Sequence, residues 1–296
     1  MNRPLVVTAT PTAFAADGSV DLDSTTRVFE HALAGGVDAL FVNGTTAEFP
    51  ALDRAERRAA LAAAAAVAGP DRVIAHVGAA GPFETAQLAR DAAELGITRA
   101  SVLTPYYLPA SLDGVRRQVD AALATLPAEA VFLYLFPDRT GVQLPADAAA
   151  AVIDDYGLAG AKISIAGTGY LAELVAALRT PRTVLSGNDG LLREVVAAGG
   201  GGVVSGVSSA IAPPFVRLRD AMEAGDTAEV DAAAAPVNAV VPVLGSSIAA
   251  LKESLALQGV IADAGCRLAI DPLDPATVDR VHAITREHAT GAVAAP

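Results

Sequence analysis

The sequence is poor in several residue types, and each shortage excludes a class of protein. It contains no tryptophan and a single cysteine, Cys266, so neither an internal disulfide nor a cysteine-rich zinc site can form. Of its 21 basic residues only Lys162 and Lys252 are lysines, and 33 acidic residues give a formal charge of −12. This balance argues against a nucleic-acid partner or an anionic membrane surface, because both require clustered positive charge.

Two long uncharged runs raise the question of membrane insertion. Residues 195–216 and 232–251 are long enough to span a bilayer, but they are rich in Ala, Gly and Pro rather than Leu. We therefore interpret them as buried segments of a soluble protein. The first residues lead directly into a strand-like run, without the apolar stretch and cleavage site of a signal peptide. The sequence thus predicts a cytoplasmic protein with no membrane partner.

Short β-rich runs alternate with longer helical runs along most of the chain. This alternation predicts an α/β fold: a TIM (β/α)8 barrel with the active site in residues 1–212, and a C-terminal three-helix extension in residues 213–296 packed on the barrel. The predicted strands are 5–10, 37–42, 72–77, 100–103, 131–134, 158–163, 183–185 and 202–205. The predicted helices are 24–34, 53–68, 83–95, 112–126, 146–155, 168–178 and 190–198, then 213–224, 227 to about 258 with breaks at its prolines, and 275–288. Ser24, Asp53 with Glu56, and Ser111 stand where helix N-caps are expected.

Polar residues follow several of the predicted strands. In a barrel of this type the chemistry lies at the carboxyl ends of the strands, so these residues are candidates for one site. Lys162 is the most informative of them. A lysine in an apolar strand either faces the barrel mouth as a reactive amine or lies outward with its ammonium in water, and position alone does not separate the two. Tyr134 favours the first reading over its own alternative as a barrel-filling ring, because Schiff-base chemistry also needs a group that moves protons.

The motifs at these strand ends resemble those of the dihydrodipicolinate synthase and N-acetylneuraminate lyase family of pyruvate-dependent Schiff-base aldolases. Residues 44–48, Gly-Thr-Thr-Ala-Glu, resemble the family's Gly-Thr-Thr-Gly-Glu signature. Residues 134–141 resemble its tyrosine segment ending Pro-x-Arg-Thr-Gly, and Gly160-Ala161-Lys162 matches its Gly-x-Lys strand. With Tyr106-Tyr107 and residues 186–189, the resemblance runs in order from Leu5 to about Gly259.

The resemblance implies a role for each matching residue. Lys162 would form the Schiff base with pyruvate, and the backbone of the turn containing Gly44, Thr45 and Thr46 would hold the pyruvate carboxylate. Tyr134 would move protons, linked through the Thr45 hydroxyl to Tyr107 of a neighbouring subunit. The protein would therefore be a homo-oligomer, a dimer or a homotetramer.

The second substrate would meet Arg139, whose planar guanidinium suits a carboxylate. The alternative reading of Arg139 is a loop residue paired with Asp138 or another acid. By the same resemblance Gly187, Asn188, Val204 and Ser205 would line the site, although Ser205 alone fits an ordinary strand end equally well. No cofactor and no metal are implied, and the four histidines lack the spacing of a metal site. Lys252 is interpreted as structural.

Several departures from the family pattern leave the substrate open. Ala47 replaces the usual glycine, which removes easy access to positive φ, and Ile163-Ser164 follows the lysine where synthases often have Glu-Ala. Arg54, Arg57 and Ala80 depart from the residues of lysine-inhibited synthases, which argues against feedback. Three hypotheses follow: a 4-hydroxy-tetrahydrodipicolinate synthase joining pyruvate with aspartate semialdehyde, an aldolase or dehydratase for 2-keto-3-deoxy sugar acids, and a catalytically inactive paralogue that binds a keto acid.

Overall fold

The computed structural model describes residues 3–245 and 247–289. Eight parallel strands close into a barrel in the order of the sequence, which confirms the predicted fold class. The strands are β1 Leu5–Ala9, β2 Ala39–Val42, β3 Val73–His76, β4 Ala100–Leu103, β5 Val131–Leu135, β6 Gly160–Ile163, β7 Thr183–Ser186 and β8 Gly202–Ser205. The helices are α1 Leu22–Ala34, α2 Arg54–Ala68, α3 Pro82–Glu94, α4 Leu112–Leu123, α5 Pro137–Thr140, α6 Ala146–Tyr156, α7 Gly169–Ala177, α8 Leu192–Ala197, α9 Pro213–Ala224, α10 Thr227–Leu244, α11 Ile248–Leu257 and α12 Pro275–His288.

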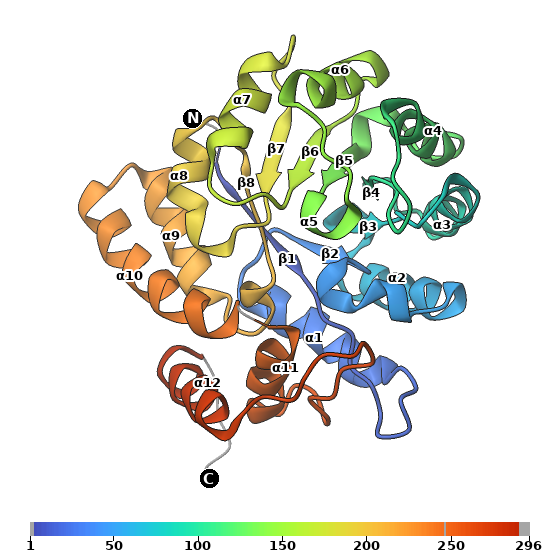
Figure 1. The fold of residues 1–296 in the computed structure, drawn as a ribbon. Coiled ribbons are helices and arrows are strands. Elements are labelled where there is room, and N and C mark those ends of the chain that lie inside the picture. The colour runs from blue at the N-terminus through green and yellow to red at the C-terminus, as the bar shows by residue number, and fades with distance from the viewer. Residues whose placement is uncertain (1–2, 246, 290–296) are drawn as a thin grey trace. The chain divides into compact units, whose positions relative to one another are not determined.

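The chain divides into two compact units, one formed by Val73–Val204 and the other by the residues before and after that segment. In the Val73–Val204 unit, β3 to β8 pair in parallel, and α3 lies beside α4 and α6 beside α7 (Figure 1). All residues of β4, β5 and β6 are buried. Strands buried on both faces carry continuous apolar runs, and this is why β4 and β5 are recognisable in the sequence.

The other unit joins the two ends of the chain. It contains the pair β1–β2, with Val7 opposite Ala39 and Ala9 opposite Phe41. Helix α1 packs on α2, α9 on α10, and α11 on α12 (Figure 1). The predicted boundary at residue 212 stays a prediction.

Helix ends follow the predicted caps in two places and differ in a third. The Asp53 carboxylate accepts from the Glu56 N–H while the Glu56 side chain accepts from the Asp53 N–H, the reciprocal capping box expected at α2. Ser111 caps α4 as predicted. The prediction of Ser24 as a cap is wrong, because α1 begins two residues earlier and Asp21 accepts from the Ser24 N–H.

The second helix of the predicted extension is divided differently from the expectation. Helix α10 continues through Pro236 and Pro242 to Leu244, with Gly245 as its C-cap, and α11 begins at Ile248. The sequence suggested breaks at the prolines because each removes a hydrogen-bond donor. Among the described residues no single helix is long and apolar enough to cross a membrane, and α10 with α11 reaches that length and composition only across a bend of 111°.

Candidate active site

Lys162 and Tyr134 lie side by side on neighbouring strands. Tyr134 of β5 stands directly opposite Lys162 of β6 in the strand register. The Lys162 Nζ lies 3.7 Å from the centre of the Tyr134 ring, and the two residues are 6% and 0% exposed. The alternative of an outward lysine with its ammonium in water does not fit this burial.

Two further side chains surround the Tyr134 ring. His76, at the end of β3, meets it edge to face with ring centres 5.8 Å apart, and Phe136 stacks on it at 6.1 Å. Sequence reasoning does not place His76 in the site, because a single histidine in an apolar strand has no recognisable spacing. The only feature that could have indicated His76 is its position at the carboxyl end of β3, where site residues of a barrel lie.

Glycines allow the strands that carry this pair to pack closely. Gly160, two residues before Lys162, has φ 148°, and a Cβ at this position would collide with the Thr183 backbone of β7. The Gly187 N–H donates to the Ile163 carbonyl at 2.6 Å, and a Cβ on Gly187 would collide with the Ser164 hydroxyl. Side chains at either position would separate β6 from β7 and displace Lys162.

The turn after β2 belongs to the other compact unit and contains the Gly-Thr-Thr-Ala-Glu motif. Residues Thr45–Ala47 form one 3₁₀ turn, in which the Ala47 N–H donates to Gly44 and the Glu48 N–H donates to Thr45. The N–H groups of Thr45 and Thr46 therefore stand at the N-terminal end of the turn, which has a positive partial charge. Gly44 is required here because a Cβ would lie 2.6 Å from the Phe41 ring.

The remaining predicted lining residues have structural contacts. The Asn188 amide donates to the Ile165 carbonyl at 3.2 Å, and Val204 is buried in the Val73–Val204 unit. In the other unit, the Ser205 hydroxyl accepts from the Ser208 N–H at 3.0 Å. This contact matches the alternative reading of Ser205 as a strand-end residue.

Tyr107 differs from the other predicted site residues. Its side chain is 90% exposed, and its backbone has φ 76°, a conformation that costs energy for a bulky residue. The described residues of its own chain thus leave most of the ring uncovered.

Comparison with known proteins identifies the family. A family model described as the dihydrodipicolinate synthetase family matches residues 4–288. This chain belongs to the dihydrodipicolinate synthetase family. A 4-hydroxy-tetrahydrodipicolinate synthase of Xanthomonas axonopodis pv. citri is 36% identical over 231 residues, which cover 78% of this chain and 75% of that protein. An uncharacterised DapA-like lyase of Halobacterium salinarum is 35% identical over 268 residues, covering 88% and 85%. The crystal structure of dihydrodipicolinate synthase DapA-2 of Bacillus anthracis superposes with a TM-score of 0.86 at 25% identity, covering 97% of this chain and 98% of that one.

Membership of the dihydrodipicolinate synthetase family makes the chain a lyase, since members of the family are lyases that act through a Schiff base. The departure from the family signature at Ala47 does not have the expected effect on the backbone. Positive φ occurs at Asn43 (61°) and Glu48 (58°), on either side of the turn, whereas Ala47 lies within the turn and is buried. The motif therefore accommodates alanine without strain at this position.

Arg139 lies on α5 and is exposed. Its guanidinium carbon is 5.9 Å from the centre of the Phe136 ring, and within the described part of the chain no carboxylate forms a salt bridge with it. The alternative reading, a pair with Asp138 or another acid, is not observed there.

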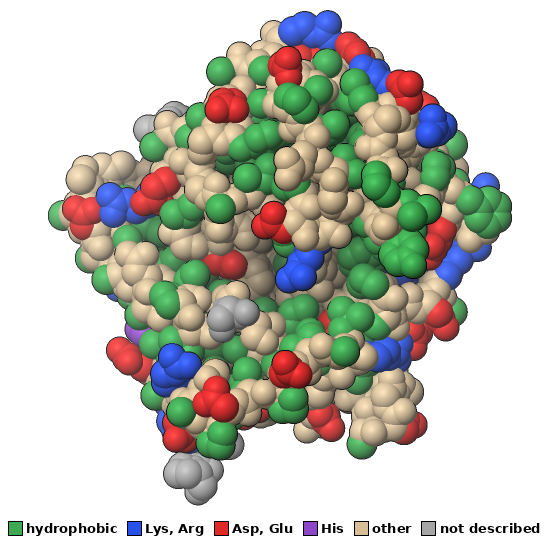
Figure 2. Space-filling view, in the orientation of Figure 1, with side chains coloured by type: hydrophobic (Ala, Val, Ile, Leu, Met, Phe, Trp, Pro, Cys, Tyr) green, Lys and Arg blue, Asp and Glu red, His purple; other side chains and the backbone are tan. Residues whose placement is uncertain are grey.

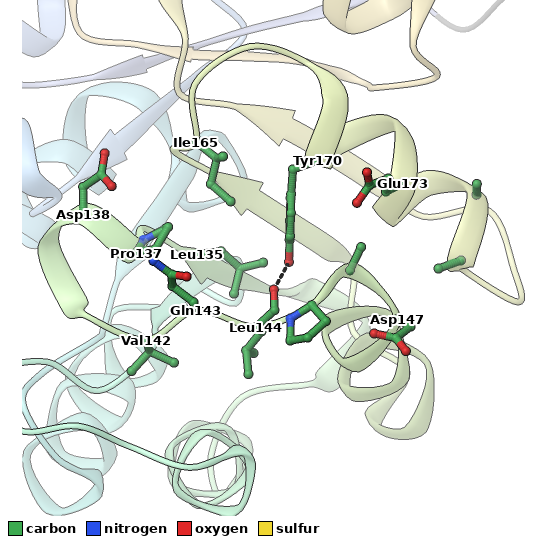
Figure 3. Close-up of a pocket in the computed structure, with 14 residues that line it drawn as sticks. Leu135, Pro137, Asp138, Val142, Gln143, Leu144, Asp147, Ile165, Tyr170 and Glu173 are labelled. Atoms are coloured by element: carbon green, nitrogen blue, oxygen red, sulfur yellow. Dashed lines mark hydrogen bonds between the residues drawn. The ribbon is translucent and has the colours of Figure 1, made fainter.

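A groove of about 1030 Å³ is lined by residues that include Leu135, Leu144 and Tyr170 (Figure 3). Leu135 lines the groove and follows Tyr134 in β5, and because side chains alternate along a strand it points to the opposite side from Tyr134. The Tyr170 hydroxyl donates to the Leu144 carbonyl across the groove at 3.0 Å. Burial and the nearby carboxylates of Glu173 and Asp147 raise the pKa of Tyr170 to about 12. The groove is thus separate from the lysine site.

The surface charge agrees with the composition. Acidic and basic side chains are interspersed on the face shown in Figure 2, with no broad basic area. Across residues 3–245 and 247–289, no group of three or more metal-ligating side chains comes together.

Proposed function

We propose that this chain is a pyruvate-dependent Schiff-base aldolase of the dihydrodipicolinate synthase type, with Lys162 as the nucleophile. The observation that carries the proposal is the buried contact of the Lys162 Nζ with the Tyr134 ring, at 3.7 Å. A buried amine beside a phenol combines the nucleophile and the proton-transfer group that an imine reaction requires.

The reaction follows from these two groups. The Lys162 amine attacks the keto carbon of pyruvate, and the resulting carbinolamine loses water to give an iminium. Loss of a methyl proton then gives an enamine, whose carbon attacks the aldehyde carbon of the second substrate. Water finally hydrolyses the iminium and regenerates the amine. Tyr134 donates and accepts the protons of these steps.

The turn at Gly44, Thr45 and Thr46 is proposed to bind the pyruvate carboxylate. The N–H groups at its N-terminal end have the charge and direction that a carboxylate needs. Gly187, Asn188, Val204 and Ser205 are proposed to shape the rest of the site. No cofactor enters the proposed steps.

Tyr107 is proposed to complete the proton relay from a neighbouring subunit, through the Thr45 hydroxyl to Tyr134. Its 90% exposure and positive φ support this role, because a strained and uncovered tyrosine needs a reason to be held outward. The proposed active form is therefore a homo-oligomer, a dimer or a homotetramer. We also retain the cytoplasm as the proposed compartment.

The proposed second substrate is aspartate semialdehyde, whose carboxylate would pair with Arg139. The exposed guanidinium without a carboxylate partner among the described residues supports this assignment. A 2-keto-3-deoxy sugar acid is the second candidate. It is favoured by Ala47 and the other departures from the family pattern around the pocket, which leave Lys162 and Tyr134 unchanged.

Borohydride trapping tests the nucleophile. The protein is incubated with pyruvate, reduced and digested, and mass spectrometry should find the adduct on Lys162. Lys252 is the internal control, being the other lysine of the chain, and Lys162→Arg should give no adduct because a guanidinium does not form an imine. An unmodified Lys162 in the wild-type protein would refute the mechanism.

Two turnover assays separate the substrates. Aspartate semialdehyde and pyruvate, coupled to a downstream reductase, should give product if the first assignment is right. Failure of that assay with release of pyruvate from a 2-keto-3-deoxy acid would favour the second. An adduct on Lys162 without turnover in either assay would identify an inactive keto-acid-binding paralogue.

A further inference from the structure

Lys252, the second lysine, lies outside the proposed chemistry and yet is completely buried. Its side chain on α11 is 0% exposed, as is that of Glu48, and the Lys252 Nζ is 2.6 Å from the Glu48 Oε1. The lysine also donates to the Gly265 carbonyl at 2.8 Å and lies 4.3 Å from the centre of the Phe14 ring. Both charges of this ion pair are therefore removed from water.

Two backbone N–H groups also donate to the Glu48 carboxylate. The N–H groups of Arg267 and Leu268 donate to its Oε2 at 2.8 and 2.7 Å. The segment between α11 and α12 is thus attached to Glu48 at two consecutive residues and to Lys252 at Gly265. The Lys252 ammonium and the two backbone N–H groups thus hold both oxygens of the Glu48 carboxylate.

Glu48 is also the residue that ends the turn of the signature motif. Its N–H donates to the Thr45 carbonyl at 3.0 Å, and its backbone is left-handed, with φ 58° and ψ 38°. A left-handed glutamate is strained and persists only where its surroundings hold it. Displacement of the Glu48 carboxylate would therefore let the backbone relax and change the hydrogen bond to Thr45.

Stability alone does not explain a buried ion pair at this place. Two apolar residues of similar size often stabilise a fold as well as a buried pair, because the charges lose their hydration. An ion pair with directed hydrogen bonds differs from an apolar contact in fixing orientation. What the ion pair of Glu48 with Lys252 contributes is then a fixed geometry of the turn to which Glu48 belongs.

We infer that Lys252 is a positioning residue, which acts through Glu48 to hold the Thr45 and Thr46 N–H groups in the orientation that binds the substrate carboxylate. The inference rests on the proposed function of that turn. It assigns to the C-terminal helices a part in substrate binding, in addition to packing.

The test compares two variants that each remove a buried cation. Lys252→Met keeps the length of the side chain and removes its charge. Arg219→Met is the matched control: Arg219 is 4% exposed and donates to the Gly36 carbonyl and the Asp38 carboxylate, ahead of β2 rather than after it. The double variant Glu48→Gln with Lys252→Met has no unpaired buried charge, which protects the test against a failure of Lys252→Met to fold.

The readout is the pyruvate concentration at which trapping on Lys162 is half-complete, together with the yield at saturation. We expect Lys252→Met and the double variant to raise the half-saturating concentration about 10- to 100-fold, the effect of a displaced binding group. The yield at saturation should stay near that of the wild type, and Arg219→Met should change neither quantity. A wild-type half-saturating concentration in the double variant would overturn the inference.

Hydrogen exchange keeps the inference separate from the proposed function. Without ligand, the peptide that contains residues 43–52 should exchange faster in Lys252→Met than in Arg219→Met. If the wild-type protein gives no adduct with pyruvate, the proposed function fails while hydrogen exchange still decides whether Lys252 holds the turn. Equal exchange in the two variants would overturn the positioning role.

Discussion

Replacement of Tyr134 by phenylalanine separates the chemistry of this residue from its packing. The ring contacts of Tyr134 are with the Lys162 Nζ at 3.7 Å, with His76 at 5.8 Å and with Phe136 at 6.1 Å. Tyr134→Phe keeps the ring and all three contacts. It removes the hydroxyl, the group proposed to move protons.

The expected effects on stability and rate differ in size. Loss of one buried hydroxyl should lower the free energy of unfolding by about 1 to 2 kcal/mol. Loss of a general acid–base group should lower kcat by about 10²- to 10⁴-fold, which corresponds to about 3 to 5 kcal/mol of transition-state stabilisation. Pyruvate should still be trapped on Lys162, but more slowly, because the amine is unchanged.

Urea unfolding and steady-state kinetics measure the two effects. Tyr170→Phe is the matched control, since it also removes one phenol hydroxyl, which donates to the Leu144 carbonyl and lines the groove rather than contacting Lys162. This control should lose about 1 kcal/mol of stability with no change of kcat. A Tyr134→Phe enzyme with kcat within about threefold of the wild type would refute the proton-transfer role, since general acid–base catalysis contributes much more than this.

Three other predictions concern titratable groups to which the proposed mechanism gives no role. The bidentate pair with Arg267 holds the pKa of Glu56 below its ordinary value, so the stabilisation by this pair is present at neutral pH and lost as pH falls through the folded pKa. Glu56→Gln, which can still cap α2, should therefore lower the free energy of unfolding by about 1 kcal/mol at pH 7 and by much less near pH 3. Urea titrations at the two pH values would measure this difference. Burial raises the pKa of the Cys266 thiol, so iodoacetamide should alkylate the native protein more slowly than the urea-unfolded chain. The plot of alkylation rate against pH should be displaced to higher pH in the native protein, and the same plot for both states would contradict this. Because burial and nearby carboxylates raise the pKa of Tyr170 to about 12, the folded state should lose stability as pH rises from about 10 towards that value, and Tyr170→Phe should lack this part of the alkaline loss in thermal melts.

The sequence was sufficient for features that depend on local pattern. The eight strands lie within a few residues of their predicted bounds, because runs such as 100–103 and 131–135 are buried on both sides and carry no charge. The helices 213–224 and 275–288 were predicted to the residue, since each starts at a proline and its limits are marked by Gly225 or Asp274. Lys162 and Tyr134 are predicted at one site because both lie on successive predicted strands and Schiff-base chemistry needs both groups, and the structure places them opposite each other in register.

Features that depend on distant contacts were not predictable. Two of the trailing helices are separated at Gly245 rather than at Pro236 or Pro242, so tertiary packing overrides the local preference of proline in α10. Lys252 was interpreted as structural, since nothing in its neighbourhood of the sequence points to Glu48. The charges of a long-range ion pair are indistinguishable from surface charges until the fold brings them together.

The separation of Glu48 and Lys252 also has a consequence for synthesis of the protein. The two residues are 204 positions apart. At about 5 to 20 residues per second, the ribosome adds Lys252 about 10 to 40 s after Glu48. During that interval Glu48 lacks the cation with which it is buried in the folded protein, so we expect the turn after β2 to be incomplete in a nascent chain that ends before α11. On the proposed role of this turn, competence to bind the substrate carboxylate would arise late in translation, once the helix that carries Lys252 has emerged.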